Sequence, residues 1–183
     1  NCPAGTGESP LEQDFDGGED FSQLCYEFNG TIIGTQGQVN GSNELETFDL
    51  VNFDTRIFKT PLTRFNGTGD ILFDHKLLRG STSGNLNSQR PEVTVKLINT
   101  SGGETTVFNY AYTDENVQNS FIPITLSGNY YVQFEFDANR NRNHKVFLDD
   151  LYIPGFVVAD EGFSGSCPAA NLRVSQIGGF PYR

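Results

Sequence analysis

Apolar and polar residues alternate along much of the chain with the two-residue period of a β-strand. In the segment 129–137, Val132, Phe134 and Phe136 fall on one face, and the polar and tyrosine side chains between them fall on the other. No segment of twelve residues carries the clean apolar stripe of an amphipathic helix. This alternation is typical of antiparallel sheets that pack one face and expose the other to water.

Short runs of β-forming residues, separated by turn residues, recur through the whole chain. The predicted strands are 11–16, 24–28, 30–34, 55–60, 70–78, 92–98, 105–112, 120–126, 129–137 and 145–153. The polar segment 79–91 is predicted to be a long loop. About ten strands without helices predict an all-β fold, a two-sheet antiparallel β-sandwich of the jelly-roll type.

The chain is expected to hold one domain and a short C-terminal segment. We assign residues 10–155 to the jelly roll, 156–166 to a linker, and 167–183 to a C-terminal tail or the stub of a following β-domain. Cys-Pro-Ala occurs both at positions 2–4 and at positions 167–169, as in a tandem array whose units begin alike. The alternative is a tail tied back by a Cys2–Cys167 disulfide. Both interpretations stay open at this point.

The charge of the chain narrows its class of partners. It carries 23 acidic and 12 basic residues, a formal net charge of −11. This argues against a nucleic-acid binder, whose affinity depends on neutralising phosphates. No apolar run of about 18 residues is present, so no membrane span is expected. The opening residues lack the charged start and apolar stretch of a signal peptide, which indicates a mature or excised fragment.

Cysteines and glycosylation motifs indicate a location outside the cytoplasm. The three cysteines are Cys2, Cys25 and Cys167. The four N-x-S/T sequons are at Asn29, Asn40, Asn66 and Asn99. These would be glycan sites in a eukaryotic secreted protein and chance products of composition in a bacterial one. We expect a secreted or cell-surface protein under either origin.

Two adjacent aspartates, Asp149 and Asp150, interrupt the apolar strand 145–153. Adjacent residues of a strand point to opposite faces, so one of the two is expected to face inward. An unpaired charge is costly to bury. The inward carboxylate should therefore be compensated by a cation, by backbone N–H groups or by an arginine such as Arg56.

Three segments resemble, in the same order, the MAM-like jelly rolls of large bacterial secreted proteins. They are QDFDGGEDFS, FKTPLTRFNGTGDILFDHKL and GNYYVQFEFDANRNRNHKVFLDDLYI, and the resemblance covers roughly residues 12–153. The tryptophans and most cysteines of animal MAM domains are missing, and Asn143 or His144 replaces a family glycine. The resemblance implies an adhesion or recognition module and not an enzyme. CPAANLRVSQIGG, from Cys167 onward, also resembles the start of a fibronectin-type unit.

The same resemblance implies a cation between the first and last strands, because some MAM-like domains carry one there. Asp14 and Asp16 are two residues apart and share one face of the first strand, and Asp150 lies on the last strand. Carboxylates and backbone carbonyls form the oxygen cage that Ca²⁺ takes. We predict a structural calcium ion held by Asp16 and Asp150, with Asp14, Glu12 or Asp49 as further ligands.

Two features are candidates for ligand binding. Arg140 and Arg142 lie in the basic segment 140–145 of an acidic protein, and guanidinium groups suit the carboxylates and sulfates of an anionic polysaccharide. The alternative is a solvated turn. Tyr131 and Gln133 share the polar face of one strand and offer a sugar an aromatic ring with a polar neighbour. The alternative is an ordinary sandwich surface.

Signals for catalysis are few. The two histidines, His75 and His144, are too few for the usual zinc site, and no G-x-S-x-G motif or phosphate loop is present. The segment 44–49, ELETFD, faintly resembles the paired-carboxylate strand of sandwich glycosidases. A polar strand at a loop edge is the favoured interpretation.

We therefore predict an extracellular adhesion or carbohydrate-binding module of a larger secreted or cell-surface protein, stabilised by a structural calcium ion. Its expected partners are an extracellular glycan or a cell-surface protein, with neighbouring domains in a tandem array. The alternatives are a glycan-active hydrolase or lyase on a β-sandwich, or a purely architectural spacer.

Overall fold

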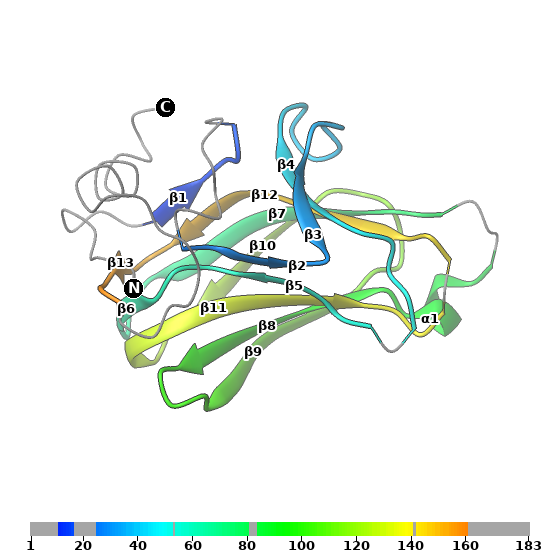
Figure 1. Ribbon diagram of the computed structural model, residues 1–183. Helices are drawn as coiled ribbons and strands as arrows, with labels where there is room; N and C mark the ends of the chain where they lie inside the picture. The colour runs from blue at the N-terminus through cyan, green and yellow to red at the C-terminus, as the bar shows by residue number, and fades with distance from the viewer. Residues whose placement is uncertain (1–10, 17–24, 53, 81–83, 141, 161–183) are drawn as a thin grey trace.

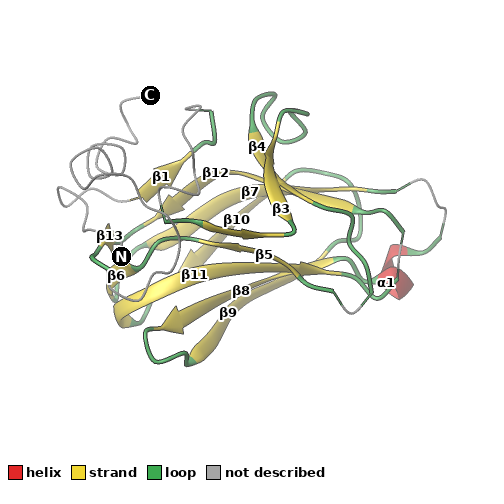
Figure 2. Ribbon diagram, viewed as in Figure 1, coloured by secondary structure: helices red, strands yellow, loops and turns green. Residues whose placement is uncertain are grey.

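The computed structural model describes residues 11–16, 25–52, 54–80, 84–140 and 142–160. Two antiparallel β-sheets stack face to face, which confirms the predicted sandwich (Figures 1 and 2). Within the described ranges, no helix is long and apolar enough to cross a membrane.

The six-stranded sheet has the strand order β10-β7-β12-β4-β3, and β1 also pairs with β12. Its strands are β1 (Leu11–Gln13), β3 (Thr31–Gly34), β4 (Glu44–Thr47), β7 (Asp70–Leu78), β10 (Gln118–Pro123) and β12 (Lys145–Ile153). The strand β12 therefore joins three partners, β1, β4 and β7, although it comes late in the sequence.

The seven-stranded sheet is organised around its longest strand, β11. Along one edge of β11, the first half of the strand pairs with β6 and the second half pairs with β5. The other edge of β11 pairs with β8, and β8 pairs in turn with the edge strand β9. The strands β13 and β2 complete the sheet beyond β6 and β5. Its strands are β2 (Glu27–Asn29), β5 (Arg56–Lys59), β6 (Thr63–Asn66), β8 (Glu92–Asn99), β9 (Glu104–Ala111), β11 (Ser127–Asp137) and β13 (Phe156–Val157).

Aromatic rings fill much of the space between the sheets. Val132, Phe134 and Phe136 are all buried, as the alternation of β11 predicts. The ring of Phe58 on β5 has its centre 5.4–6.1 Å from four other rings, which belong to Phe15, Tyr26, Phe28 and Phe134. Contacts at these centroid distances add specific geometry to the large apolar area that such rings bury.

The strands predicted at 70–78 and 145–153 have the observed bounds of β7 and β12. Two short strands, β6 and β13, were not predicted, and β4 was expected only as a polar strand at a loop edge. The predicted long loop 79–91 contains the helix α1 (Leu86–Gln89), which begins where the Asn85 side chain accepts a hydrogen bond from the backbone N–H of Asn87. It ends at Arg90, whose φ of 44° is left-handed. These elements are short and lack the extended alternation on which the prediction rested.

The sandwich extends beyond the predicted boundary at residue 155. Phe156 and Val157 form β13 and pair with β6, and Asp160 is buried. Residues 156–160, predicted to be part of a linker, thus belong to the folded domain. The predicted tail or stub, 167–183, lies outside the described residues.

Cys25 is buried and disulfide-bonded. The other two cysteines of the chain, Cys2 and Cys167, lie outside the described residues. The alternative of a Cys2–Cys167 bridge therefore stays a prediction.

Candidate functional site

The adjacent aspartates of β12 lie at a β-bulge, and neither points into the core. Asp149 is the cross-strand partner of Asp74, which sits between two buried residues of β7 and so faces outward. Partners in an antiparallel pair share a face, so Asp149 also faces outward. The register then shifts before Tyr152, and Asp150 has a left-handed φ of 49°. The expectation of an inward aspartate is corrected, because a bulge adds one residue to its strand.

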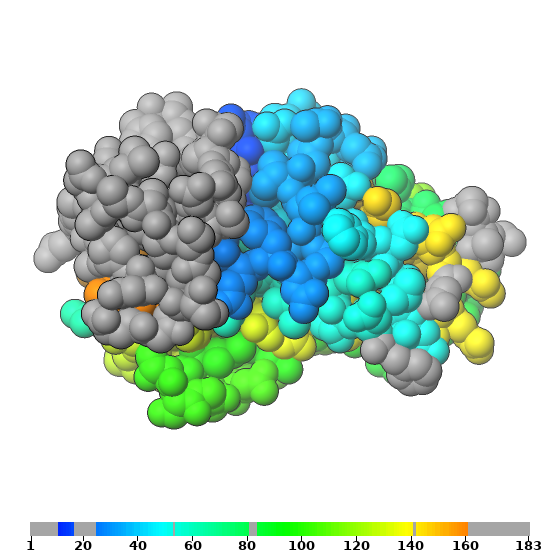
Figure 3. Space-filling view, in the orientation of Figure 1, coloured from blue at the N-terminus to red at the C-terminus, as the bar shows by residue number. Residues whose placement is uncertain are grey.

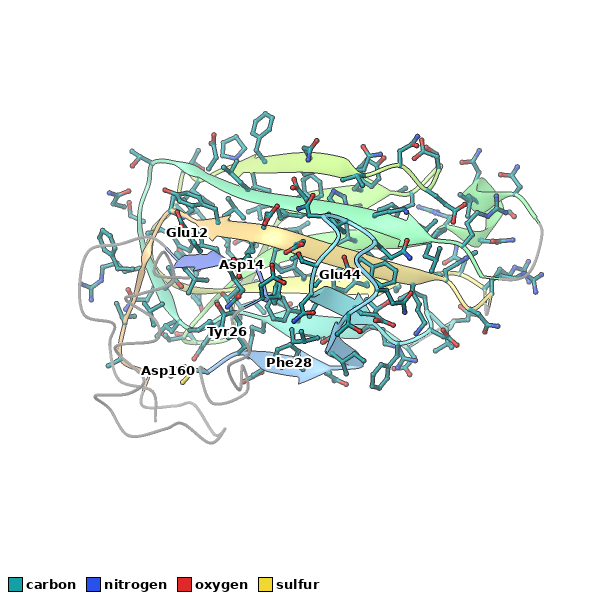
Figure 4. All side chains as sticks on the ribbon, turned by 90° about the horizontal axis from the view of Figure 1, so that it is seen from above. Glu12, Asp14, Tyr26, Phe28, Glu44 and Asp160 are labelled. Atoms are coloured by element: carbon teal, nitrogen blue, oxygen red, sulfur yellow. The ribbon has the colours of Figure 1, made fainter. Side chains whose placement is uncertain are left out.

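Asp149 is nevertheless only 1% exposed. It lies where the segment 14–16 and the start of β4 approach β12. In Figure 4, which looks down on the outer face of the six-stranded sheet, Asp14 and Glu44 flank this region. The buried carboxylate is therefore covered from outside the sandwich, by polar segments, and not by the core.

The connection between β3 and β4, residues 35–43, is fastened by two carboxylates. Glu44 accepts hydrogen bonds from the backbone N–H groups of Gln38 and Val39 at 2.8 and 2.9 Å. Asp16 accepts one from the backbone N–H of Asn43 at 2.8 Å. Hydrogen bonds from backbone N–H groups to ionised carboxylates are among the stronger kind, so both acids hold this connection in place.

Side-chain amides bind the outer aspartates from two sides. The Asn40 amide donates a hydrogen bond to Asp150 and a longer one, of 3.5 Å, to Asp74. The Asn119 amide on β10 donates to the other oxygen of Asp74 at 2.6 Å. The outer face thus carries a row of alternating amide and carboxylate groups.

Burial and neighbouring negative charges raise the pKa values of Asp149 and Asp150. Burial raises the pKa of Asp149 to about 7, and the charges of Asp150, Asp16 and Glu44 act in the same direction. Burial and the neighbouring Asp74 also raise the pKa of Asp150. One oxygen of Asp149, Oδ1, accepts the backbone N–H of Asp150 at 2.8 Å. Its Oδ2 is buried without a hydrogen-bond partner among the described residues.

The predicted calcium ligands Asp14, Asp16 and Asp150 lie around this region, and their charges act on one another. No three Asp, Glu, His or Cys side chains of the described ranges converge as a ready-made metal site. Asp14 accepts the backbone N–H of Asp16 at 3.1 Å instead. The donor set nevertheless suits a hard cation, because Asp149 adds an unsatisfied oxygen to a group of carboxylates. Calcium thus stays a prediction.

The other residues proposed for this region are placed differently. Glu12 is exposed on β1, opposite Tyr152. Arg56 pairs with Asp54 at 3.0 Å and donates to the backbone carbonyl of Asp49 at 2.9 Å, so it does not compensate Asp149. Sequence reasoning missed Asp149 as the buried acid, because no local pattern reveals the bulge that orients it.

The glutamates of ELETFD are not at a loop edge. β4 lies between β12 and β3, and both Glu44 and Glu46 are buried. Glu46 accepts hydrogen bonds from Gln36 at 3.0 Å and from Lys145 at 3.1 Å. Both carboxylates therefore stabilise the β3–β4 connection, which does not favour the glycosidase interpretation.

The two histidines occupy separate buried positions. His75 on β7 bonds the Tyr112 hydroxyl at 2.6 Å and the Ser120 hydroxyl at 2.8 Å, and burial lowers its pKa to about 4. His144 accepts the backbone N–H of Gly80 at 3.0 Å, and its other nitrogen meets Gln89. Both rings are satisfied within the fold, and His144 does not extend the basic surface proposed for 140–145.

Tyr131 and Gln133 lie on the outer face of the seven-stranded sheet. The ammonium of Lys59 lies 4.6 Å from the centre of the Tyr131 ring, and the tyrosine hydroxyl donates to Asp160 at 2.5 Å. Gln133 donates to Glu135 at 2.6 Å. Burial and the bond to Asp160 raise the pKa of Tyr131. The ring is thus held in one orientation among donors and acceptors.

Arg140 and Arg142 do not join this site. Arg140 is exposed in the turn between β11 and β12, and Arg142 is half-buried where its carbonyl meets Gly80. From Tyr131 to the end of β11 at Asp137 the strand runs six residues, roughly 20 Å. The two halves of the predicted ligand site are therefore separate surfaces.

Comparison with known proteins identifies the fold. No protein-family model matches the chain, and no curated protein sequence matches it significantly. A mutant of CBM29-2, a family 29 carbohydrate-binding module made to probe ligand recognition, is 12% identical with a TM-score of 0.52, over 81% of this chain and 91% of that chain.

Two cleaved adhesin domains of Lys-gingipain from Porphyromonas gingivalis are also similar. One is 12% identical with a TM-score of 0.57, over 79% of this chain and 97% of its own. The other is 16% identical with a TM-score of 0.53, over 80% of this chain and 98% of its own. These likenesses show a shared sandwich fold, and the narrower MAM-like resemblance finds no matching family model.

Proposed function

We propose that this protein is an extracellular recognition module that binds carbohydrate on the outer face of its seven-stranded sheet. The observation that carries the proposal is the fixed ring of Tyr131, with the Lys59 ammonium 4.6 Å from its centre and Gln133 beside it on β11. Sugars are recognised by an aromatic surface together with a few placed polar groups.

The polar groups around Tyr131 are arranged in advance. Glu135 takes a hydrogen bond from Gln133 and an ion pair from Lys96 at 3.1 Å, and Lys59 pairs with Glu27 at 2.9 Å. Pre-ordered side chains lose less entropy when a ligand binds. Donors and acceptors alternate across the face, as the hydroxyl groups of a sugar require.

The residue types agree with those tested in the structural neighbours. The CBM29-2 variants made to probe ligand recognition replace a tyrosine, a lysine, an arginine or an aspartate by alanine. Tyrosine, lysine and carboxylate groups are the ones that gather around Tyr131. The disulfide of Cys25 and the adhesin name of the gingipain domains support a secreted or cell-surface location.

We also propose a structural calcium ion on the outer face of the six-stranded sheet. Asp149, Asp150 and Asp16 would supply carboxylate oxygens, and Asp14 lies within reach of the same group. The support is the buried Oδ2 of Asp149, which has no hydrogen-bond partner among the described residues. A divalent cation would remove the mutual repulsion of these acids and fasten β1 to β12.

The sugar site is tested by titration calorimetry with glycans selected on an array. We expect Tyr131→Ala and Gln133→Ala to weaken binding about tenfold, the loss of about 1.4 kcal/mol. Gln118→Ala on β10 is the matched control and should bind like the parent. If all three variants bind equally, or if no glycan binds the parent, the proposed function is wrong.

A further inference from the structure

The outer face of the six-stranded sheet carries an apolar row that the site around Tyr131 does not use. Phe121 on β10 pairs with Leu72 on β7, and Leu72 pairs with Tyr152 on β12. Cross-strand partners share a face, so the three side chains form one line. Phe121 is 62% exposed and Leu72 is 43% exposed, and both therefore present apolar surface to water.

The next row of the same face is polar and ordered. It consists of Asn119, Asp74 and Asp149, which are also paired in register. The amide of Asn119 is bonded to Asp74 at 2.6 Å, and Asn40 reaches the same aspartate from the β3–β4 connection. The amide of Asn119 and the carboxylate of Asp74 thus stand beside Phe121 and Leu72, whereas Asp149 is buried.

The β3–β4 connection borders this face on one side. It projects above the six-stranded sheet in Figure 1, and it forms the uppermost blue-to-cyan surface in Figure 3. Because Glu44 and Asp16 fix its backbone, it is a stable border. We call this surface the ledge. Its apolar floor consists of Phe121, Leu72 and Tyr152, and Asn119 and Asp74 lie at its edge.

The dimensions fit a small ligand better than a protein. The row spans three adjacent strands, so its ends are roughly 10 Å apart. A specific protein interface buries about 800 Å² on each partner and needs a larger apolar centre. A row of three apolar side chains beside hydrogen-bonding groups matches the face and the hydroxyl edge of a short sugar chain.

The charge of the ledge selects among sugars. Asp74 lies in the adjacent row and the exposed Glu12 lies opposite Tyr152, and no arginine or lysine pairs with either of them among the described residues. Like charges repel, so uronic and sulfated glycans are disfavoured here. The neutral face of a pyranose ring suits Phe121, and its hydroxyl groups suit Asn119 and Asp74.

We infer that the ledge formed by Phe121, Leu72 and Tyr152, together with Asn119 and Asp74, is a second recognition site that binds a neutral oligosaccharide. It lies on the opposite sheet from Tyr131, and it shares with the proposed function only the class of ligand. Two sites on opposite faces would let one module cross-link neutral glycan chains.

The test is titration calorimetry with cellohexaose, mannohexaose and xylohexaose, with polygalacturonate as the acidic probe. We expect Phe121→Ala to weaken binding of a neutral oligosaccharide about tenfold, a change of about 1.4 kcal/mol. Asn119→Ala should weaken it as well. Phe48→Ala is the matched control, because Phe48 is 46% exposed and lies away from the ledge, beside Arg56. Its binding should equal that of the parent.

The outcomes separate this inference from the proposed function. Loss of one binding event in Phe121→Ala, with the Tyr131-dependent event intact, supports the ledge. If Phe121→Ala binds like the parent while Tyr131→Ala does not, the ledge is wrong and the proposed function stands. A parent that prefers polygalacturonate at the ledge, or a parent dimer that Phe121→Ala dissociates, also overturns the inference.

Discussion

Asp74 on β7 and Asp149 on β12 are direct cross-strand partners on the outer face of the six-stranded sheet. Like charges directly opposite one another destabilise a sheet. The amide of Asn119 binds Asp74, but one oxygen of Asp149 is buried without a hydrogen-bond partner among the described residues. This pair therefore marks the place where stability depends on protons or on a cation.

The first prediction concerns calcium. Calcium added to the metal-stripped protein should raise its melting temperature, because a ligand that binds only the folded state at a hundredfold excess over Kd stabilises it by about 2.7 kcal/mol. Asp149→Asn and Asp150→Ala should each remove the rise, measured by thermal melting with and without EDTA. Asp114→Asn, in an exposed turn, should retain it. Equal melting of the stripped parent with and without calcium would contradict the prediction.

The second prediction concerns pH and is made for the metal-free protein. The pKa of His75 is lowered from 6.5 to about 4, so its contribution to stability is complete above pH 6.5 and is lost as the pH falls toward 4. His75→Gln should remove this loss. The stability of the variant relative to the parent should then rise toward acid, by at most about 1.4 kcal/mol per pH unit.

Asp149 should behave in the opposite way. Its pKa is raised from 3.8 to about 7, so its contribution is complete below pH 3.8 and is lost as the pH rises through 7. The stability of Asp149→Asn relative to the parent should therefore increase between pH 4 and pH 7. Urea unfolding of both variants across this range checks the two signs. Parallel pH profiles for the parent, His75→Gln and Asp149→Asn would refute both assignments.

The third prediction concerns the exposed turn between β11 and β12. Arg140→Ala should leave the unfolding free energy within about 0.5 kcal/mol of the parent, because Arg140 is exposed and surface substitutions seldom change it more. Arg142 is half-buried, so the double variant with Arg142→Ala is used for the binding measurement alone. It should weaken binding to an anionic polysaccharide, and parent binding should fall as salt rises. Arg64→Ala, at an exposed arginine of β6, is the control. Unchanged affinity in the double variant would identify a solvated turn.

The fourth prediction concerns the disulfide of Cys25. Peptide mapping without reduction should find Cys25 joined to Cys2 or to Cys167, with the third cysteine outside that bridge. Removing the bridge by Cys25→Ser should lower the unfolding free energy by about 2–5 kcal/mol, the usual effect in a small secreted domain. Recovery of a Cys2–Cys167 peptide as the main product would contradict the assignment.

The strand alternation was sufficient to predict the sandwich and to place its longest strands. β7, β8 and the second half of β11 bury every second residue, and that period is a local property of the chain. It also assigned Tyr131 and Gln133 to a polar face. Short elements such as β6 were missed, because four residues with one apolar side chain are too few to show an apolar period.

The sequence by itself determined which residues alternate, how acidic the chain is, and that Asp149 and Asp150 needed compensation. Only the tertiary structure decided which aspartate is buried, because the bulge of β12 and the covering segments come from pairings with β1, β4 and β7. The same holds for the row of Phe121, Leu72 and Tyr152, whose members are far apart in sequence. Register between distant strands is set by the packing of the whole sheet, and no local pattern contains it.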